Sequence, residues 1–164
     1  MYMKLQPHLI CTSLSLLISW SCNPSNLASV LDQGTQSVNL QISHRTEWRT
    51  LWIEGETDLP DGAYVNIRII HELGQTTPMD TWPASNLMDN ARSTVKDGTF
   101  WTKINTIRWP AGSVTVSVQF PSPPQAPEIT KRYGEFGEHL AGMNVISQNG
   151  MKAINVEEIF DFRP

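Results

Sequence analysis

The sequence contains few charged residues and only two cysteines, and each of these features excludes some classes of protein. Only 17% of the 164 residues are charged, and the formal net charge is −4, from 12 basic and 16 acidic side chains. This balance gives no electrostatic footprint for nucleic acid, which requires a clustered basic face, so we expect no nucleic-acid partner. With 40% hydrophobic residues, the composition is typical of one folded domain rather than a disordered chain or a coiled coil.

Long hydrophobic runs are also lacking, apart from one near the N-terminus. Leu9–Trp20 is a run of twelve residues without charge, and Lys4 precedes it. A helix that crosses a bilayer needs about 20 apolar residues, and polar Asn23 ends this run well short of that length. The pattern therefore predicts a signal peptide over residues 1–21 and an extracytoplasmic protein.

The scarcity of cysteine excludes a disulfide within the mature chain. Of the two cysteines, Cys11 lies inside the predicted signal peptide and Cys22 directly follows it. A lone thiol in an exported protein is exposed to oxidation and mispairing. We therefore expect Cys22 to be modified.

The pair Ser21-Cys22 resembles the lipobox of bacterial lipoproteins, in which a small residue precedes a cysteine that is acylated and becomes the new N-terminus. Trp20 stands where that family has Ala or Ser. The resemblance implies lipidation of Cys22 and anchoring to a membrane in the cell envelope, with residues 22–36 as a flexible polar tether. The alternatives are an unmodified secreted protein cut near Ser21, and a translation start at Met3.

From residue 37 onward, apolar and polar residues alternate with a period of two. Leu51 and Ile53, for example, alternate with Trp52 and Glu54. This period is typical of half-buried β-strands. The segments that show it are 38–43, 51–54, 65–70, 100–104 and 114–120. Residues 153–162 are predicted as a last strand, with a short helix as the alternative.

Turn signals separate these strands, because proline presets φ and glycine accepts a positive φ. The spacing predicts an all-β fold over residues 37–164: an antiparallel two-layer sandwich of the immunoglobulin-like type, with a small barrel as the alternative. Two segments depart from the pattern. We expect residues 74–93 to form a polar loop, and residues 121–142 to form an extended crossing followed by a helical turn or loop around 134–142.

The order of turns and strands resembles bacterial immunoglobulin-like extracytoplasmic domains. The residues that carry the resemblance are the turn at Gly55–Gly62, the Asp-Gly-Thr-Phe of Asp97–Phe100, and Pro110–Gly112 before an alternating strand. The stretch Gly134–Gly142 is similar to one in uncharacterised bacterial lipoproteins that carry such a domain. The resemblance implies a sandwich fold and an envelope location, and it contains no catalytic residue.

Motifs for catalysis or metal binding are missing. His44, His71 and His139 are scattered, and His71-Glu-Leu-Gly lacks the second histidine of a zinc motif. We interpret His71 as a strand-end histidine near solvent. Neither a Gly-Xaa-Ser-Xaa-Gly elbow nor a phosphate-binding loop occurs. We expect a protein that is not an enzyme and has no cofactor. The alternative is an envelope hydrolase, since a serine triad can assemble from distant residues without a local motif. A calcium site would require loop carboxylates to converge, and the candidates are Asp58, Asp61, Asp80, Asp89 and Asp97.

Tryptophan is the most informative residue type, since five of the six lie beyond the signal peptide. Trp48, Trp52 and Trp101 occupy positions of opposite parity to the expected core residues and should point outward. We expect a long loop, either 74–93 or 121–142, to cover their rings. The alternatives are that these indoles form a ligand or partner face, or that the strand parity is misassigned.

These observations predict a non-enzymatic, lipid-anchored extracytoplasmic module with an interaction or structural role. The alternative is a carbohydrate- or cell-wall-binding module that uses outward-facing tryptophans, which would need Trp52 and Trp101 to be exposed and coplanar. The expected partners are the membrane, through the lipid, and an envelope protein or a glycan.

Overall fold

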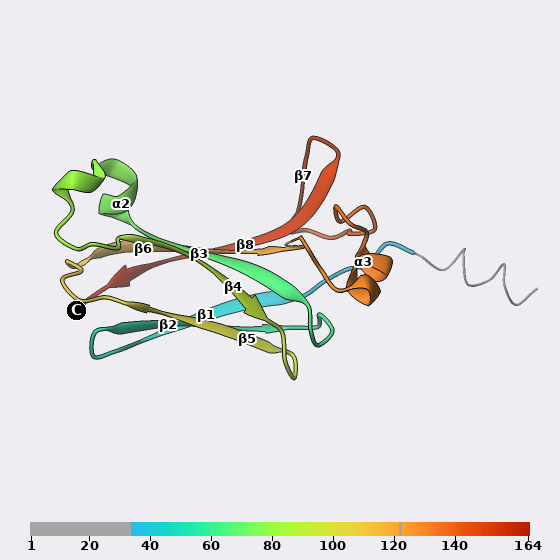
Figure 1. Cartoon of the computed structure of the whole chain (residues 1–164), viewed down its shortest axis with the longest axis horizontal. Coiled ribbons are helices and arrows are strands. Elements are labelled where there is room, and N and C mark those ends of the chain that lie inside the picture. Colours follow the sequence, from blue (N-terminus) through green and yellow to red (C-terminus); the bar gives the residue numbers. More distant parts are fainter. Residues whose placement is uncertain (1–33, 122) are drawn as a thin grey trace, which may run out of the picture. The chain divides into compact units, whose positions relative to one another are not determined.

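Two antiparallel β-sheets packed face to face make up the fold (Figure 1). The computed structural model describes residues 34–121 and 123–164. One sheet has three strands in the order β1-β2-β5, and the other has five in the order β4-β3-β6-β8-β7. The predicted antiparallel two-layer sandwich is confirmed. The predicted signal peptide and Cys22 lie outside the described residues.

Within the described ranges, the chain forms eight strands and three short helices. The three-stranded sheet contains β1 (Leu40–Glu47), β2 (Thr50–Thr57) and β5 (Thr99–Asn105). The five-stranded sheet contains β3 (Tyr64–His71), β4 (Met88–Thr94), β6 (Gly112–Phe120), β7 (Val145–Gln148) and β8 (Met151–Phe162). The helices are α2 (Glu72–Thr76), the 3-10 helix η1 (Met79–Thr81) and α3 (Pro127–Tyr133).

A single apolar core fills the space between the sheets. Leu51 and Ile53 of β2 are fully buried, as are Val116 and Val118 of β6, and all four belong to one cluster. Because side chains alternate between the two faces of a strand, this burial places Trp52 on the outer face of its sheet. The predicted parity of these strands is therefore correct.

Glycine at position 55 allows the core to close tightly. Gly55 of β2 pairs with Phe100 of β5, and a β-carbon at Gly55 would overlap the ring of Phe100. The buried ring lies over the glycine in place of a side chain. This packing holds β5 against β2 and directs its next residue, Trp101, to the outside.

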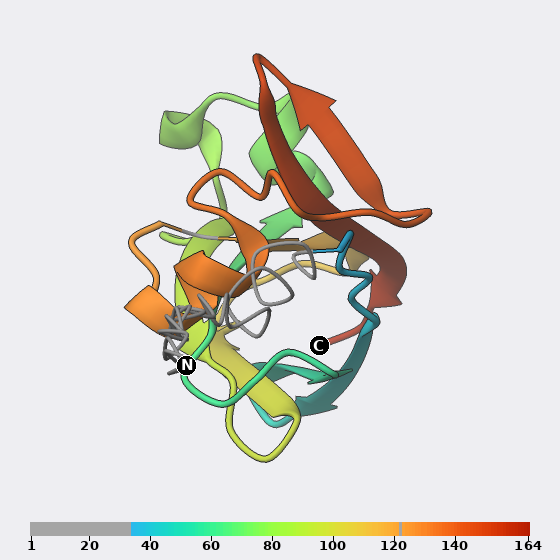
Figure 2. The same ribbon diagram turned by 90° about the vertical axis from the view of Figure 1, so that its right-hand side faces the viewer.

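Side-chain contacts close both open flanks of the sandwich, whose two layers Figure 2 shows end-on. On one flank, His44 of β1 stacks on Phe160 of β8 with ring centroids 3.5 Å apart, and its Nδ1 lies 3.1 Å from a carboxylate oxygen of Glu158. On the other flank, the Ser93 hydroxyl of β4 donates to the Trp101 carbonyl of β5 at 2.8 Å. The two sheets are thus linked along both edges.

Residues 74–93 are not simply a polar loop, as the sequence analysis expected. They include most of α2, the whole of η1 and, from Met88, nearly all of strand β4. Strand β4 has no fully buried residue, because it lies at the edge of its sheet and pairs through its main chain with β3. The sequence of such a strand has little hydrophobic alternation, so it is not predicted as a strand.

The segment 121–142 contains a helix earlier than expected. Helix α3 begins at Pro127, where proline fits the first turn because it has no N–H to leave unpaired. It buries Ile129 and Tyr133, which are four residues apart and share one helix face. Gly134 ends the helix with φ +88°. The helix therefore lies before Gly134, and residues 134–142 form a loop, as the alternative expectation had it.

His71 is buried, although the sequence analysis placed it near solvent. Its side chain is 0% exposed, its Nδ1 accepts from the Leu73 amide at 3.2 Å, and its Nε2 lies 3.2 Å from the Pro110 carbonyl. The ring also meets Trp109 edge-on, with centroids 5.5 Å apart. His71 is thus the N-cap of α2, because its ring accepts a bond from an otherwise unpaired helix amide.

Gln36, at the end of the segment predicted as a tether, is hydrogen-bonded to the domain. Its amide donates to the His139 carbonyl at 2.7 Å, and its carbonyl accepts from the Ala141 amide at 3.0 Å. The chain thus joins the sandwich beside the segment that follows α3.

Replacing Leu51 or Val116 by Asp should unfold the domain. Both side chains are fully buried, and an unpaired carboxylate in an apolar core costs several kcal/mol against a total stability of about 5–15 kcal/mol. Thermal melting followed by circular dichroism measures the loss. Gln41→Asp, on the exposed outer face of β1, is the matched control and should melt as the wild type does. Wild-type melting of both core variants would mean that the core face is wrongly assigned.

Candidate functional site

The outer face of the three-stranded sheet brings two tryptophans and two basic side chains together. Arg45 of β1 lies opposite Trp52 of β2, which lies opposite Lys103 of β5. In the neighbouring row, Glu54 of β2 lies opposite Trp101 of β5. We call these five residues the indole face. Trp52, Glu54, Trp101 and Lys103 point away from the core, since their neighbours along each strand are buried or half-buried. Arg45 lies on the same face because it is paired with Trp52.

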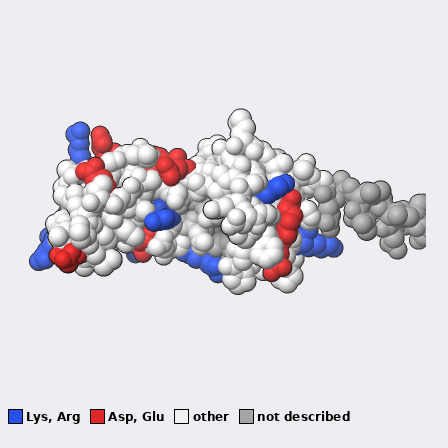
Figure 3. Space-filling view, turned by 90° about the horizontal axis from the view of Figure 1, so that it is seen from above, with Lys and Arg blue, Asp and Glu red and all other residues white. Residues whose placement is uncertain are grey.

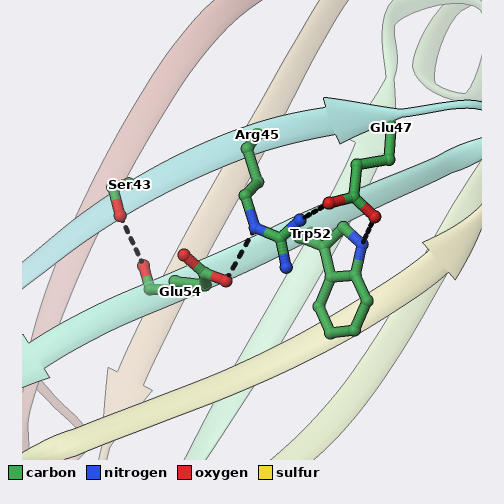
Figure 4. A network of polar contacts seen from close by, with 5 residues as sticks. All are labelled: Ser43, Arg45, Glu47, Trp52 and Glu54. Carbon is green, nitrogen blue, oxygen red and sulfur yellow. Dashed lines mark hydrogen bonds and ion pairs between the residues drawn. The ribbon is translucent and has the colours of Figure 1, made fainter.

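A polar network holds Trp52 and Arg45 in place (Figure 4). The Arg45 Nε donates to Glu54 at 3.0 Å, and its guanidinium also donates to Glu47 at the end of β1. Glu47 accepts in turn from the Trp52 indole N–H at 3.2 Å. The hydrogen bond to Glu54 is the main cause that raises the pKa of Arg45, with further contributions from the charges of both carboxylates. Arg45 therefore remains a cation that is fixed beside the indole.

Two cations lie over the ring of Trp52. The guanidinium carbon of Arg45 is 4.4 Å from the ring centroid and the Lys103 ammonium is 5.3 Å away, both within the range of cation–π attraction. Among the described residues, Lys103 forms no ion pair with a carboxylate. Its positive charge is thus available to a partner, whereas Arg45 is already engaged.

Trp52 and Trp101 are neighbours but are not coplanar. Their ring centroids are 5.5 Å apart and the planes are tilted by 44°. Trp101 is 55% exposed, whereas Trp52 is half-buried between its neighbours. Trp101 therefore presents an open ring, whereas Arg45 and Lys103 lie over the ring of Trp52.

No described loop covers the indole face, contrary to our expectation for these tryptophans. Helix α2 projects from the side of the five-stranded sheet, and α3 lies at the end where the described chain begins (Figure 1). Trp101 and Trp48 are accordingly exposed, Trp48 by 82%. Segments 74–93 and 121–142, which were expected to cover the tryptophans, lie instead beside the five-stranded sheet and at one end of the sandwich.

Trp48 does not belong to this face, although its sequence position suggested the same parity as Trp52. It lies in the turn between β1 and β2, where the Arg49 guanidinium stacks over its ring at 4.2 Å. The other two tryptophans of the described chain are structural. The indole N–H of Trp109 donates to the Asn86 carbonyl at 2.8 Å, and that of Trp82 to the Thr77 carbonyl at 3.1 Å.

Arg45 and Lys103 were not among the site residues predicted from the sequence. Their relation to Trp52 depends on the register of three strands, two of which are separated by more than forty residues of chain. Strand alternation alone predicts that each residue points outward, but it does not predict which residues lie side by side.

In the part of the chain that the structure describes, no three His, Cys, Asp or Glu side chains converge as metal ligands would. Three of the candidate calcium ligands accept a hydrogen bond from a main-chain amide: Asp58 from Asn39 and Asp61 from Asp97, both at 2.8 Å, and Asp89 from Asn90 at 2.9 Å. From above the five-stranded sheet, basic and acidic side chains are interspersed (Figure 3). No helix of the described residues has the length and hydrophobicity to cross a bilayer.

Comparison of the chain with protein-family models, with curated proteins and with solved structures finds no match.

Substitutions should separate the exposed tryptophan from the buried one. Trp101→Ala should change the free energy of unfolding by about 1 kcal/mol or less, because the ring is more exposed than buried. Trp109→Ala should cost about 3–5 kcal/mol, since its ring is 2% exposed and loses both its packing and its hydrogen bond. Urea denaturation measures both values. A larger loss for Trp101→Ala than for Trp109→Ala would contradict the assignment of the outer face.

Proposed function

We propose that this protein is a non-enzymatic interaction module, held on the outer side of a membrane by lipid on Cys22, with the indole face as its partner surface. The observation that supports the proposal is the pair Trp52–Trp101, which lies uncovered on a sheet face beside the unpaired ammonium of Lys103. The exposed ring of Trp101 has no role in the core.

The composition of the indole face favours a protein partner. Tryptophan and arginine are the side chains most enriched among the few residues that dominate binding energy at protein interfaces. Trp52 and Arg45 are already held by hydrogen bonds to Glu47 and Glu54, so little conformational entropy would be lost on binding. We infer that Trp101 supplies apolar contact and that Lys103 pairs with a carboxylate of the partner.

A glycan is the second candidate ligand, and the exposed ring of Trp101 favours it. Stacking of a sugar needs an aromatic ring with an open face. A platform of two rings would need coplanar indoles, whereas these are tilted by 44° and Trp52 has two cations over its ring. A carbohydrate would therefore have to bind through Trp101 alone, which makes a protein partner the better fit.

We also propose that the sandwich is of the immunoglobulin-like type, and the strand order supports this. Strands β1-β2-β5 face a sheet that contains β3-β6-β8, as strands A-B-E face C-F-G in immunoglobulin-type sandwiches. Strand β4 pairs with β3, and the short β7 extends the sheet at its other edge.

Cys22→Ala should release the protein from the membrane fraction into the soluble fraction. Acyl chains on the thiol and the new N-terminus would anchor the protein, since each buried methylene contributes about 0.8 kcal/mol. Immunoblotting of cell fractions after a salt wash measures the distribution. Cys11→Ala, in the part removed with the signal, is the matched control and should stay in the pellet. If Cys22→Ala also stays in the pellet, lipid is not the anchor.

Photo-crosslinking in intact cells tests the partner surface. A benzophenone amino acid at position 43 of the full-length protein, exposed on β1 opposite Glu54, should give one discrete protein adduct, and Trp101→Ala should abolish it. The same photo-residue at exposed position 68, on the other sheet, is the control and should give no such adduct. The identified partner, once purified, should bind Trp101→Ala about tenfold or more weakly than the wild type.

The other outcomes of this experiment are equally informative. If no protein adduct forms but a glycan quenches the tryptophan fluorescence of the wild type and not of Trp101→Ala, the carbohydrate alternative replaces the proposal. If neither occurs, the indole face is not a binding surface.

A further inference from the structure

A second site lies at the end of the sandwich, apart from the indole face. The β1–β2 turn, the β5–β6 connection and the residues after β8 surround an open hollow of about 800 Å³. Three arginines line it, one from each of these segments: Arg49, Arg108 and Arg163. All three are exposed.

These three guanidinium groups have no carboxylate partner among the described residues. None of them forms an ion pair with a side chain or with the carboxyl group of Pro164. Glu47 is the one acidic side chain among the described residues that line the hollow, and its carboxylate is engaged by Arg45 and by the Trp52 indole. The side chains that line the hollow therefore carry three positive charges against one acidic group, in a protein whose net charge is −4.

Two of the arginines have an unusual backbone conformation. Arg49 has φ +60° and Arg108 has φ +65°, in the left-handed region that side chains with a β-carbon rarely adopt. The other non-glycine residues with positive φ in the described chain are Asp97 and Asn149, both of types that tolerate this conformation. The Arg49 carbonyl accepts from the Thr106 amide at 2.9 Å, which fixes the two arginine-bearing turns to each other.

Apolar side chains complete the hollow. Trp109 and Phe162, both 2% exposed, meet edge-to-face at 5.5 Å beneath it. Trp48, which is 82% exposed, and Ile107, which is 43% exposed, lie beside the arginines on the two turns. Arg49 stacks over Trp48 at 4.2 Å, and stacking of this kind leaves the N–H edge of a guanidinium able to bind an anion.

We infer that this hollow binds a small organic polyanion, with two or more carboxylate or phosphate groups on a flat or apolar body. Planar guanidinium groups bind carboxylate and phosphate through paired hydrogen bonds, and Trp48 and Ile107 would contact the body of the ligand. The hollow lies at the end of the sandwich opposite the point where the described chain begins (Figure 1).

Isothermal titration calorimetry on the whole protein tests the site with two probes. Benzene-1,3,5-tricarboxylate carries three carboxylates on a flat ring, and its neutral tricarboxamide is the matched control. Pyrophosphate tests the phosphate source. We expect at least one of the two anions to bind, the tricarboxamide not to bind, and affinity to fall as salt is raised.

Arg49→Gln and Arg108→Gln should each weaken binding by about tenfold or more, because each removes hydrogen bonds to a charged group. Arg68→Gln removes one exposed charge from the other sheet and should leave the affinity unchanged, as should Trp101→Ala on the indole face. Thermal melting near that of the wild type shows that a variant is folded. If one of the two does not fold, Arg163→Gln, after the last strand, takes its place.

The outcomes separate the possible ligands. Binding of the tricarboxylate alone assigns the site to carboxylates, and binding of pyrophosphate alone assigns it to phosphates. The inference is overturned if neither anion binds, if the tricarboxamide binds equally well, or if the arginine variants retain the wild-type affinity. None of these results depends on whether the indole face binds a partner.

Discussion

Burial of the facing apolar side chains of the two sheets is the constraint on which the rest of this structure depends. In the three-stranded sheet, every strand places alternate residues into this core, and the close packing of Phe100 on Gly55 leaves no freedom to shift β5 against β2. Once Leu51 and Ile53 are inside, Trp52 must be outside, and the same applies to Trp101 beside Phe100. The outward indoles are therefore a direct consequence of how the core is built.

Because of the same constraint, the residues that stabilise the fold are different from those of the proposed binding surface. The inner faces and the flank contacts of His44 and Ser93 hold the sheets together, whereas the outer face of the three-stranded sheet contributes little to the core. Its hydrogen bonds serve to fix Arg45 and Trp52. The side chains of this outer face can therefore vary without loss of the fold.

Sequence patterns predicted the fold more fully than the site. Alternation over residues 114–120 and 51–54 was enough to place strands and core, since that pattern is set by the core itself. Strand β4 was missed because it is a polar edge strand held by main-chain pairing. The neighbours of Trp52 depend on strand register, the exposure of Trp101 depends on where distant loops lie, and the burial of His71 depends on a cap and a carbonyl 39 residues away. None of these can be read from local periodicity.

The central claim is that the indole face is open while the core tryptophan is not. Hydroxyl-radical footprinting of the purified protein, read by mass spectrometry at each tryptophan, tests it most directly. We predict rapid oxidation of Trp101, which is 55% exposed, and protection of Trp109, which is 2% exposed. Protection of Trp101 to the same degree as Trp109 would show that another part of the chain covers this face, and would contradict the account.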